Sequence, residues 1–129
     1  MEKNDNSFIV FACAGCSRAG QASYKVALEL DEHGVAEMSC LAGIASEKPS
    51  FYRKIKNKKI ITIDGCTTEC SKGVFDKMGI QVDIHVKLKE YGIRKNGPIN
   101  DYDVKRLVEE VEKEAISESH LIISGEPGS

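Results

Sequence analysis

The chain has 129 residues, of which 41% are hydrophobic, and its formal net charge is -2 at pH 7. A domain of this length can bury a core without disulfide bonds, and the slight acidic excess argues against a dedicated nucleic-acid binder. The sequence shows no secretory leader and no apolar run long enough to span a membrane. We therefore expect one cytoplasmic domain over residues 1–129, with frayed ends at 1–6 and 124–129, and neither a nucleic-acid nor a membrane partner.

The first half of the chain alternates strand-like and helix-like patterns. Residues 8–12 form a continuous apolar run, which is typical of a strand covered on both faces. Small and apolar residues then recur every three or four positions, which predicts a helix over residues 19–34. A second strand is predicted over 35–39. Helical sequence follows from Leu41, and Pro49 is expected to open a further helical segment.

The clearest strand in the chain covers residues 60–63, where four β-forming residues follow one another. It leads into Asp64 and a glycine, after which the sequence becomes helical. Thr67 or Thr68 can cap this helix, because hydroxyl oxygens accept hydrogen bonds from the first main-chain N–H groups. We expect the helix to end at Gly79.

A fourth strand is predicted over residues 82–88, where apolar and polar side chains alternate cleanly. Such alternation is typical of a half-exposed edge strand, so His85 is expected on the exposed polar face. Asn100 or Asp101 then caps a last helix, whose apolar residues follow the helical period.

Strands that alternate with helices predict right-handed crossovers and a parallel sheet. The expected fold class is therefore α/β, with a small three-layer parallel sheet of about four strands and helices on both faces. The strand order 2-1-3-4, as in flavodoxin-like and Rossmann-like folds, is favoured because it places the alternating fourth strand at an edge. In such sheets ligands bind beyond the carboxyl ends of the strands.

Cysteines follow three of the four predicted strands. Cys13 and Cys16 come after the first, Cys40 after the second, and Cys66 and Cys70 after the third. Because the carboxyl ends of parallel strands meet at one edge of a sheet, we expect the five sulfurs to gather at the same rim. In a reducing compartment, clustered cysteines more often bind metal or carry out redox chemistry than form structural disulfides.

The spacing of the cysteines suits a tetrahedral zinc site. Zinc takes four ligands, and a two-residue spacer lets one turn present both Cys13 and Cys16. Cys66 and Cys70 lie about one helical turn apart. These four are the principal candidate ligands, with Cys40 as an exchangeable fifth or as a replacement for one of them. The same thiols could instead perform thiol-based redox chemistry, or could hold an iron-sulfur cluster.

The remaining polar residues near the strand ends have more ordinary roles. Asp64 could be a metal ligand, could hydrogen-bond to a ligand or could act as a base, but capping the following turn or helix is the favoured interpretation. Arg18 comes one residue too early to close the phosphate-binding loop of a phosphatase or arsenate reductase. No catalytic residue can be assigned from these patterns.

The residues around the cysteines resemble a known family. The similar segments are Cys13-Ala14-Gly15-Cys16-Ser17, Gly20-Gln21, Cys40-Leu41-Ala42-Gly43-Ile44, Ile63-Asp64-Gly65-Cys66 with Cys70, and Tyr91-Gly92-Ile93. Together they resemble the DGC-domain family, small prokaryotic proteins that are named after the Asp-Gly-Cys motif and associated with zinc. The similarity runs from about Phe8 to Arg94. It implies an α/β fold and zinc as the metal, and it implies no established reaction.

The sequence thus predicts a cytosolic zinc-binding protein whose metal site draws on Cys13, Cys16, Cys40, Cys66 and Cys70. Metal binding, sensing and storage are all compatible with such a site. A thiol-based oxidoreductase, a sulfur-transfer protein and an iron-sulfur protein are the alternatives. The metal ion is the one partner that the sequence indicates.

Overall fold

The computed structural model describes residues 8–13, 17–65, 68–94 and 97–125, with side chains as far as residue 117. Its elements are β1 (Phe8–Ala12), α1 (Arg18–Glu32), β2 (Glu37–Met38), α2 (Leu41–Ala45), α3 (Pro49–Ile55), β3 (Lys59–Asp64), α4 (Cys70–Lys77), β4 (Ile84–Lys87), a 3-10 helix (Leu88–Tyr91) and α5 (Asp101–Gly125). Of the predicted frayed ends, residues 1–6 and 126–129 lie outside the described residues, while Ser124 and Gly125 complete α5.

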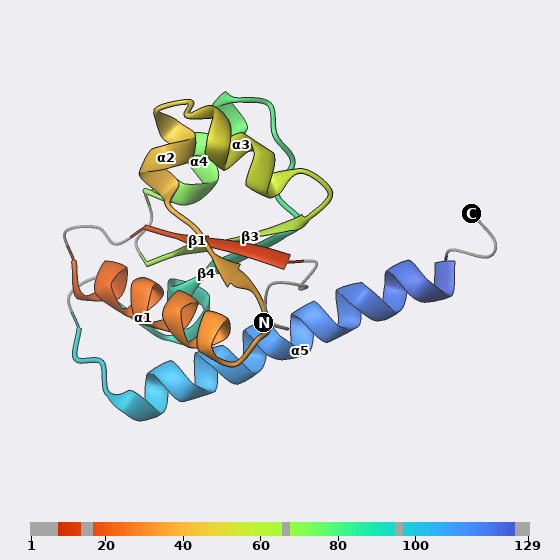
Figure 1. Cartoon of the computed structure of the whole chain (residues 1–129). Coiled ribbons are helices and arrows are strands. Elements are labelled where there is room, and N and C mark those ends of the chain that lie inside the picture. The colour runs from red at the N-terminus through yellow and green to blue at the C-terminus, as the bar shows by residue number, and fades with distance from the viewer. Residues whose placement is uncertain (1–7, 14–16, 66–67, 95–96, 126–129) are drawn as a thin grey trace.

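The four strands form one parallel sheet in the order β2-β1-β3-β4. Figure 1 shows β1 and β3 side by side in the middle of the molecule. The predicted α/β class and the predicted strand order are both confirmed. Each strand therefore ends at the same rim of the sheet.

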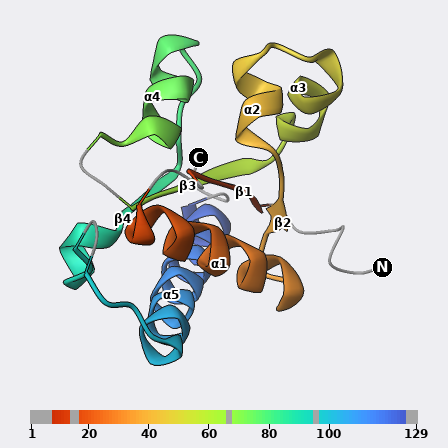
Figure 2. The ribbon, with the colours of Figure 1, turned by 90° about the vertical axis from the view of Figure 1, so that its left-hand side faces the viewer.

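Helices cover both faces of the sheet. Figure 2 shows α1 and α5 on one face and α2, α3 and α4 on the other. Side chains alternate along each strand, so Val10 and Ile61 join the core under α1 and α5, whereas Ile9 and Phe11 join the core under α2 and α4. In the second core, the rings of Phe11 and Phe75 meet edge-on with centroids 5.0 Å apart.

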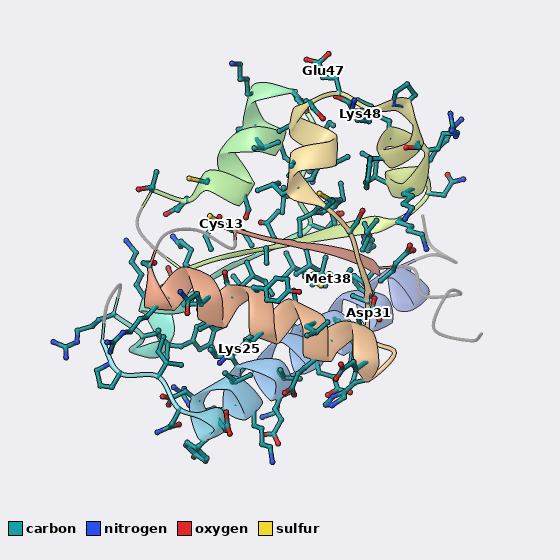
Figure 3. All side chains as sticks on the ribbon, turned by 60° about the vertical axis from the view of Figure 1, so that its left-hand side comes forward. Cys13, Lys25, Asp31, Met38, Glu47 and Lys48 are labelled. Carbon is teal, nitrogen blue, oxygen red and sulfur yellow. The ribbon has the colours of Figure 1, made fainter. Side chains whose placement is uncertain are left out.

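Strand β2 is shorter than the predicted span of residues 35–39. The main-chain N–H groups of Val35 and Ala36 donate to the carbonyl of Leu30, so they complete the end of α1 instead of extending the strand. The Met38 N–H donates to Oδ2 of Asp31 at 2.8 Å, and these two residues lie close together in Figure 3. The short strand is thus held to α1 along its outer edge.

The last helix begins where the sequence predicted. Oδ1 of Asn100 accepts a hydrogen bond from the Asp103 N–H at 2.9 Å, and Oδ2 of Asp103 accepts one from the Asn100 N–H at 3.3 Å. This reciprocal pair satisfies donors at the start of the helix. No helix in the described part of the chain is both long and apolar enough to cross a membrane.

Candidate thiolate site at the sheet rim

Cys13 is fixed at the rim through its main chain. Its N–H continues the β1–β3 ladder by donating to the Ile63 carbonyl at 3.2 Å, and its carbonyl accepts from the Ser23 hydroxyl of α1 at 2.6 Å. Figure 3 shows Cys13 at the end of β1, on the side of the sheet where α2 and α4 lie. The half-buried side chain therefore has a defined position on that face.

Cys40 follows β2 and is the residue that precedes the first turn of α2. Its main-chain carbonyl accepts from the N–H groups of Gly43 and Ile44, so the residue is built into the start of this short helix. Its side chain is exposed and forms no disulfide. The Cys40 thiol is thus accessible at the rim.

Cys70 is the first residue of α4, and its side chain is likewise exposed and not in a disulfide. Glu69 precedes it with a left-handed backbone at φ 54° and makes no side-chain capping bond. The predicted cap at Thr68 is wrong, because the helix begins two residues later and Asp64 takes over the capping role. Thr67, the other predicted cap, lies outside the described residues.

The structure brings Cys13 and Cys40 into the wall of one cavity above the ends of β1 and β2. Within the described residues, no three Cys, His, Asp or Glu side chains lie close enough together to hold a metal ion. Cys16 and Cys66, which complete the predicted set of ligands, lie outside the part of the chain that the structure describes. The zinc site therefore stays a prediction.

Asp64 ends β3 with a side chain that is only 1% exposed. Its Oδ1 accepts from the Ser71 N–H at 2.8 Å, and its Oδ2 accepts from the Lys72 N–H at 3.1 Å. Both donors belong to the first turn of α4, whose N–H groups have no partner within the helix. Asp64 is therefore a helix cap supplied from the preceding strand, which matches the favoured interpretation of its role.

His85 also contacts Asp64. Its Nε2 lies 3.1 Å from Oδ2 of Asp64, and its side chain is 15% exposed. Because a carboxylate oxygen accepts hydrogen bonds, Nε2 is the donor, and in the neutral ring Nδ1 then carries the lone pair. The prediction of an exposed His85 is wrong, because its ring lies against the buried Asp64 carboxylate even though β4 lies at the edge of the sheet.

Gly65, the middle residue of the Asp-Gly-Cys motif, lies against the start of α1. A Cβ atom at this position would collide with the main chain of Ala19 and Gly20. Only glycine lets β3 end this close to the helix. Asp64 and Gly65 therefore have separate structural roles: the aspartate caps the N-terminus of α4, and the glycine allows the start of α1 to pack against the end of β3.

Helix N-termini also shape the electrostatics of this rim. Both α1 and α4 begin there, and a helix N-terminus carries a partial positive charge. On the β4 side, the Glu90 carboxylate lies 3.1 Å from the Lys87 ammonium. The hydrogen bond and charge of Glu90, followed by the charge of Glu69, raise the pKa of Lys87. The end of β4 at this rim thus carries an ion pair of opposite charges.

The fold and the rim together define a small α/β domain with thiols after its parallel strands and an aspartate-glycine turn after β3. Residues 9–113 match the DGC domain family, and the chain belongs to this family. Among curated proteins it is similar to the anaerobic and virulence modulator AnvM of Pseudomonas aeruginosa, with 34% identity over 108 residues that cover 81% of this chain and 82% of AnvM. No solved structure gives a significant match.

Proposed function

We propose that this chain is a cytosolic zinc-binding protein with a cysteine thiolate site at the carboxyl-end rim of its sheet. Cys13, Cys16, Cys66 and Cys70 are the principal ligands, and Cys40 is an exchangeable fifth. One observation carries the proposal: all three described cysteines belong to this rim, Cys13 at the end of β1, Cys40 after β2 and Cys70 at the start of α4. Three elements far apart in sequence thus each bring a thiol to one edge.

The donor chemistry of the rim fits zinc. Both carboxylate oxygens of Asp64 are engaged by α4 and His85, so sulfur is the main donor that the motif can offer. Thiolates favour zinc, copper(I) and iron-sulfur clusters, whereas magnesium and calcium prefer oxygen. A zinc ion with four thiolate ligands would stabilise the loops that carry them, and it would leave no open position for catalysis.

A regulatory role suits such a closed site better than storage. The Pseudomonas aeruginosa relative is named an anaerobic and virulence modulator. Thiolate ligands respond to oxidants, because oxidation to a disulfide removes the negative charge that makes the sulfur a strong ligand. We therefore favour zinc-linked sensing by the rim cysteines.

Thiol chemistry without metal is the second candidate function. It is favoured by one observation, the exposed thiol of Cys40 in the wall of a cavity that Cys13 also lines. In this case Cys13 or Cys66 would be the attacking thiolate and a neighbouring cysteine would resolve the mixed disulfide. An iron-sulfur cluster on the same thiolates would be a third outcome, and visible absorption would distinguish it from colourless zinc.

The test is metal analysis combined with a thiol titration on protein purified without oxygen. We expect close to one zinc per chain and a set of thiols that react with Ellman's reagent only after a chelator has removed the metal. Single Cys→Ser changes at 13, 16, 66 and 70 should each lower the zinc content. The matched control is Cys40→Ser, which should retain it.

Three results would contradict the zinc proposal. Protein without metal in which all five thiols react at once would exclude zinc and favour metal-free thiol chemistry. Full zinc content in both Cys16→Ser and Cys66→Ser would exclude the ligand set, because these two residues are half of the four proposed ligands. Coloured protein with bound iron would indicate an iron-sulfur cluster in place of zinc.

A further inference from the structure

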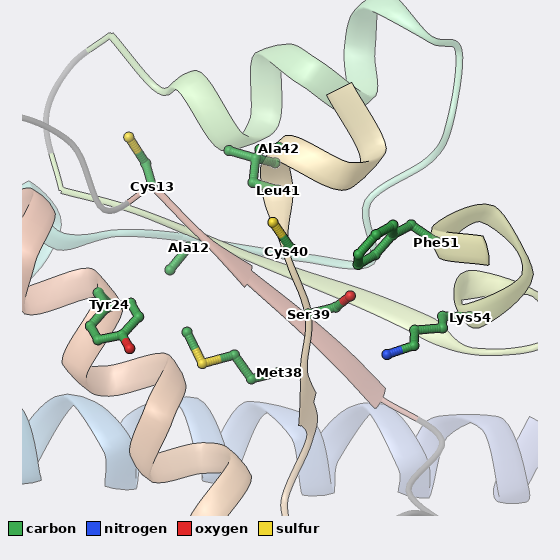
Figure 4. A pocket seen from close by; sticks show the side chains of 10 residues that line it. All are labelled: Ala12, Cys13, Tyr24, Met38, Ser39, Cys40, Leu41, Ala42, Phe51 and Lys54. Carbon is green, nitrogen blue, oxygen red and sulfur yellow. The ribbon is translucent and has the colours of Figure 1, made fainter. Parts of the chain in front are cut away.

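A cavity of about 660 Å³ lies above the carboxyl ends of β1 and β2. Its volume falls within the range of roughly 300–1,000 Å³ that small-molecule sites occupy in proteins. Its position is also the edge at which open α/β sheets bind ligands. Figure 4 shows the lining side chains, which extend from Tyr24 and Met38 on one side of the Cys40 segment to Phe51 and Lys54 on the other.

One end of this cavity is apolar and aromatic. Tyr24 of α1 leaves 44% of its surface exposed, although it is a large and largely apolar residue. Met38 lines the same end, and its flexible thioether can adapt to the shape of an apolar ligand. Leu41 continues the apolar wall toward α2. This end can therefore accommodate a flat apolar or aromatic group.

The other end contains a cation and an unpaired hydroxyl. The Lys54 ammonium lies over the Phe51 ring, 5.7 Å from its centroid, and its side chain is half exposed. The Ser39 hydroxyl is buried and has no hydrogen-bond partner in the described structure. A buried hydroxyl without a partner is unfavourable, so an acceptor group that reaches it would be favoured. Figure 4 shows Ser39 and Lys54 directed toward the same region.

Lys54 can turn toward a ligand without leaving its present partner unpaired. Its ammonium lies 3.7 Å from Glu37, a long and loose ion pair. The ammonium of Lys58 lies at the same distance from the other oxygen of that carboxylate. Glu37 would thus retain a cation when Lys54 moves.

We propose that this cavity binds a small amphiphilic organic acid, with an aromatic or apolar body against Tyr24 and Met38 and its anionic head at Lys54 and Ser39. The proposal goes beyond the zinc site and does not depend on it. It also gives Cys40 a second role, because its thiol lies in the wall between the two ends of the cavity. A bound ligand would shield this thiol from alkylation.

The test uses anilinonaphthalene sulfonate (ANS), a fluorescent probe with an aromatic body and a sulfonate head. We expect saturable binding of one ANS per intact chain and slower alkylation of Cys40 by N-ethylmaleimide in its presence, followed by mass spectrometry. Lys54→Met should weaken binding by roughly fivefold, the effect of losing one partly exposed ion pair. Adding Ser39→Ala to Lys54→Met should weaken ANS binding more than Lys54→Met alone. The neutral probe N-phenylnaphthylamine should bind the unchanged protein less tightly than ANS does.

The matched control is Lys58→Met, which removes the other cation beside Glu37 from a residue that does not line the cavity. It should bind ANS like the unchanged protein. Equal losses in Lys54→Met and Lys58→Met, non-saturable fluorescence, or unprotected Cys40 would each overturn the proposal. Circular dichroism establishes that each variant is folded. Because zinc content is measured separately on the same samples, failure of ANS binding leaves the metal proposal unaffected.

Discussion

Asp64 and His85 are joined across β3 and β4, with Oδ2 of the aspartate 3.1 Å from Nε2 of the histidine. The same carboxylate accepts hydrogen bonds from the Ser71 and Lys72 N–H groups at the start of α4. One buried side chain thus connects the central sheet, the edge strand and the helix that carries Cys70. Any change in this carboxylate should affect the position of that helix.

We predict that Asp64→Ala lowers the free energy of unfolding by roughly 2–4 kcal/mol, the combined effect of losing a helix cap and leaving buried donors unpaired. The measurement is urea unfolding at neutral pH. Asp76→Ala is the control, because it removes an exposed carboxylate that pairs with the Lys72 ammonium on the same helix. Its effect should stay within about 0.5 kcal/mol. Similar losses in the two variants would mean that the Asp64 network contributes little.

We predict that Gly65→Ala is also strongly destabilising, for a steric reason. The new Cβ would meet the main chain of Ala19 and Gly20, which cannot move without shifting the start of α1. The expected loss in unfolding free energy is about 1–3 kcal/mol or more.

Gly73→Ala provides the comparison for this change. Gly73 lies in α4, and a Cβ there would meet no atom within 4 Å apart from the adjoining backbone of its own helix. Alanine should therefore stabilise the helix by about 0.5–1 kcal/mol. A stable Gly65→Ala variant, measured by the same urea titration, would show that the close approach of β3 and α1 is not needed.

The main features of the fold could be predicted because local patterns and crossover rules agree. The buried run over Phe8–Ala12 and the strand over Lys59–Asp64 have β-forming residues that no helix period explains. The placement of Cys13 at the end of β1 and of Cys70 after β3, the described cysteines that follow these strands, could be expected for the same reason. Topology alone determines which strand ends meet.

Local patterns could not predict the partners of Asp64 and His85. The alternation in β4 correctly places Ile84 and Val86 in one core, but it does not indicate that His85, on the opposite face, meets the buried Asp64 carboxylate. Register supplies the missing information: Thr62 pairs with His85 and Asp64 with Lys87, so Asp64 and His85 share a face on neighbouring strands. The sequence did contain a signal for this contact, because Thr62 and Asp64 are polar residues on that face of β3.

We predict that Thr62→Val stabilises the protein. Thr62 is fully buried, and its hydroxyl makes no hydrogen bond in the described structure. Valine has the same shape, so the change should raise the unfolding free energy by about 1 kcal/mol or more. Thr62→Ser keeps the hydroxyl and removes a methyl group, which should cost about 1 kcal/mol. Destabilisation by valine in urea unfolding would show that the hydroxyl has a partner.

We predict that Tyr91 makes the protein less stable at alkaline pH. Burial, and then the charges of Glu114, Glu110 and Glu90, raise the pKa of this phenol in the folded state. Above the ordinary tyrosine pKa of about 10, the unfolded chain loses its proton first, so unfolding becomes more favourable as pH rises. The stability that the neutral phenol contributes is fully present below the unfolded-state pKa and is lost as pH rises through the raised folded-state pKa.

Tyr91→Phe removes the titrating phenol. As pH rises through about 10, the unfolding free energy of this variant should therefore fall less than that of the unchanged protein, because the variant has no proton to lose at this position. Tyr102→Phe is the control, because Tyr102 is 70% exposed on α5. Urea unfolding across this range, with the ionised phenol followed by ultraviolet absorption, measures both variants. If Tyr91→Phe and Tyr102→Phe have the same alkaline slope, burial of Tyr91 does not contribute to the pH dependence.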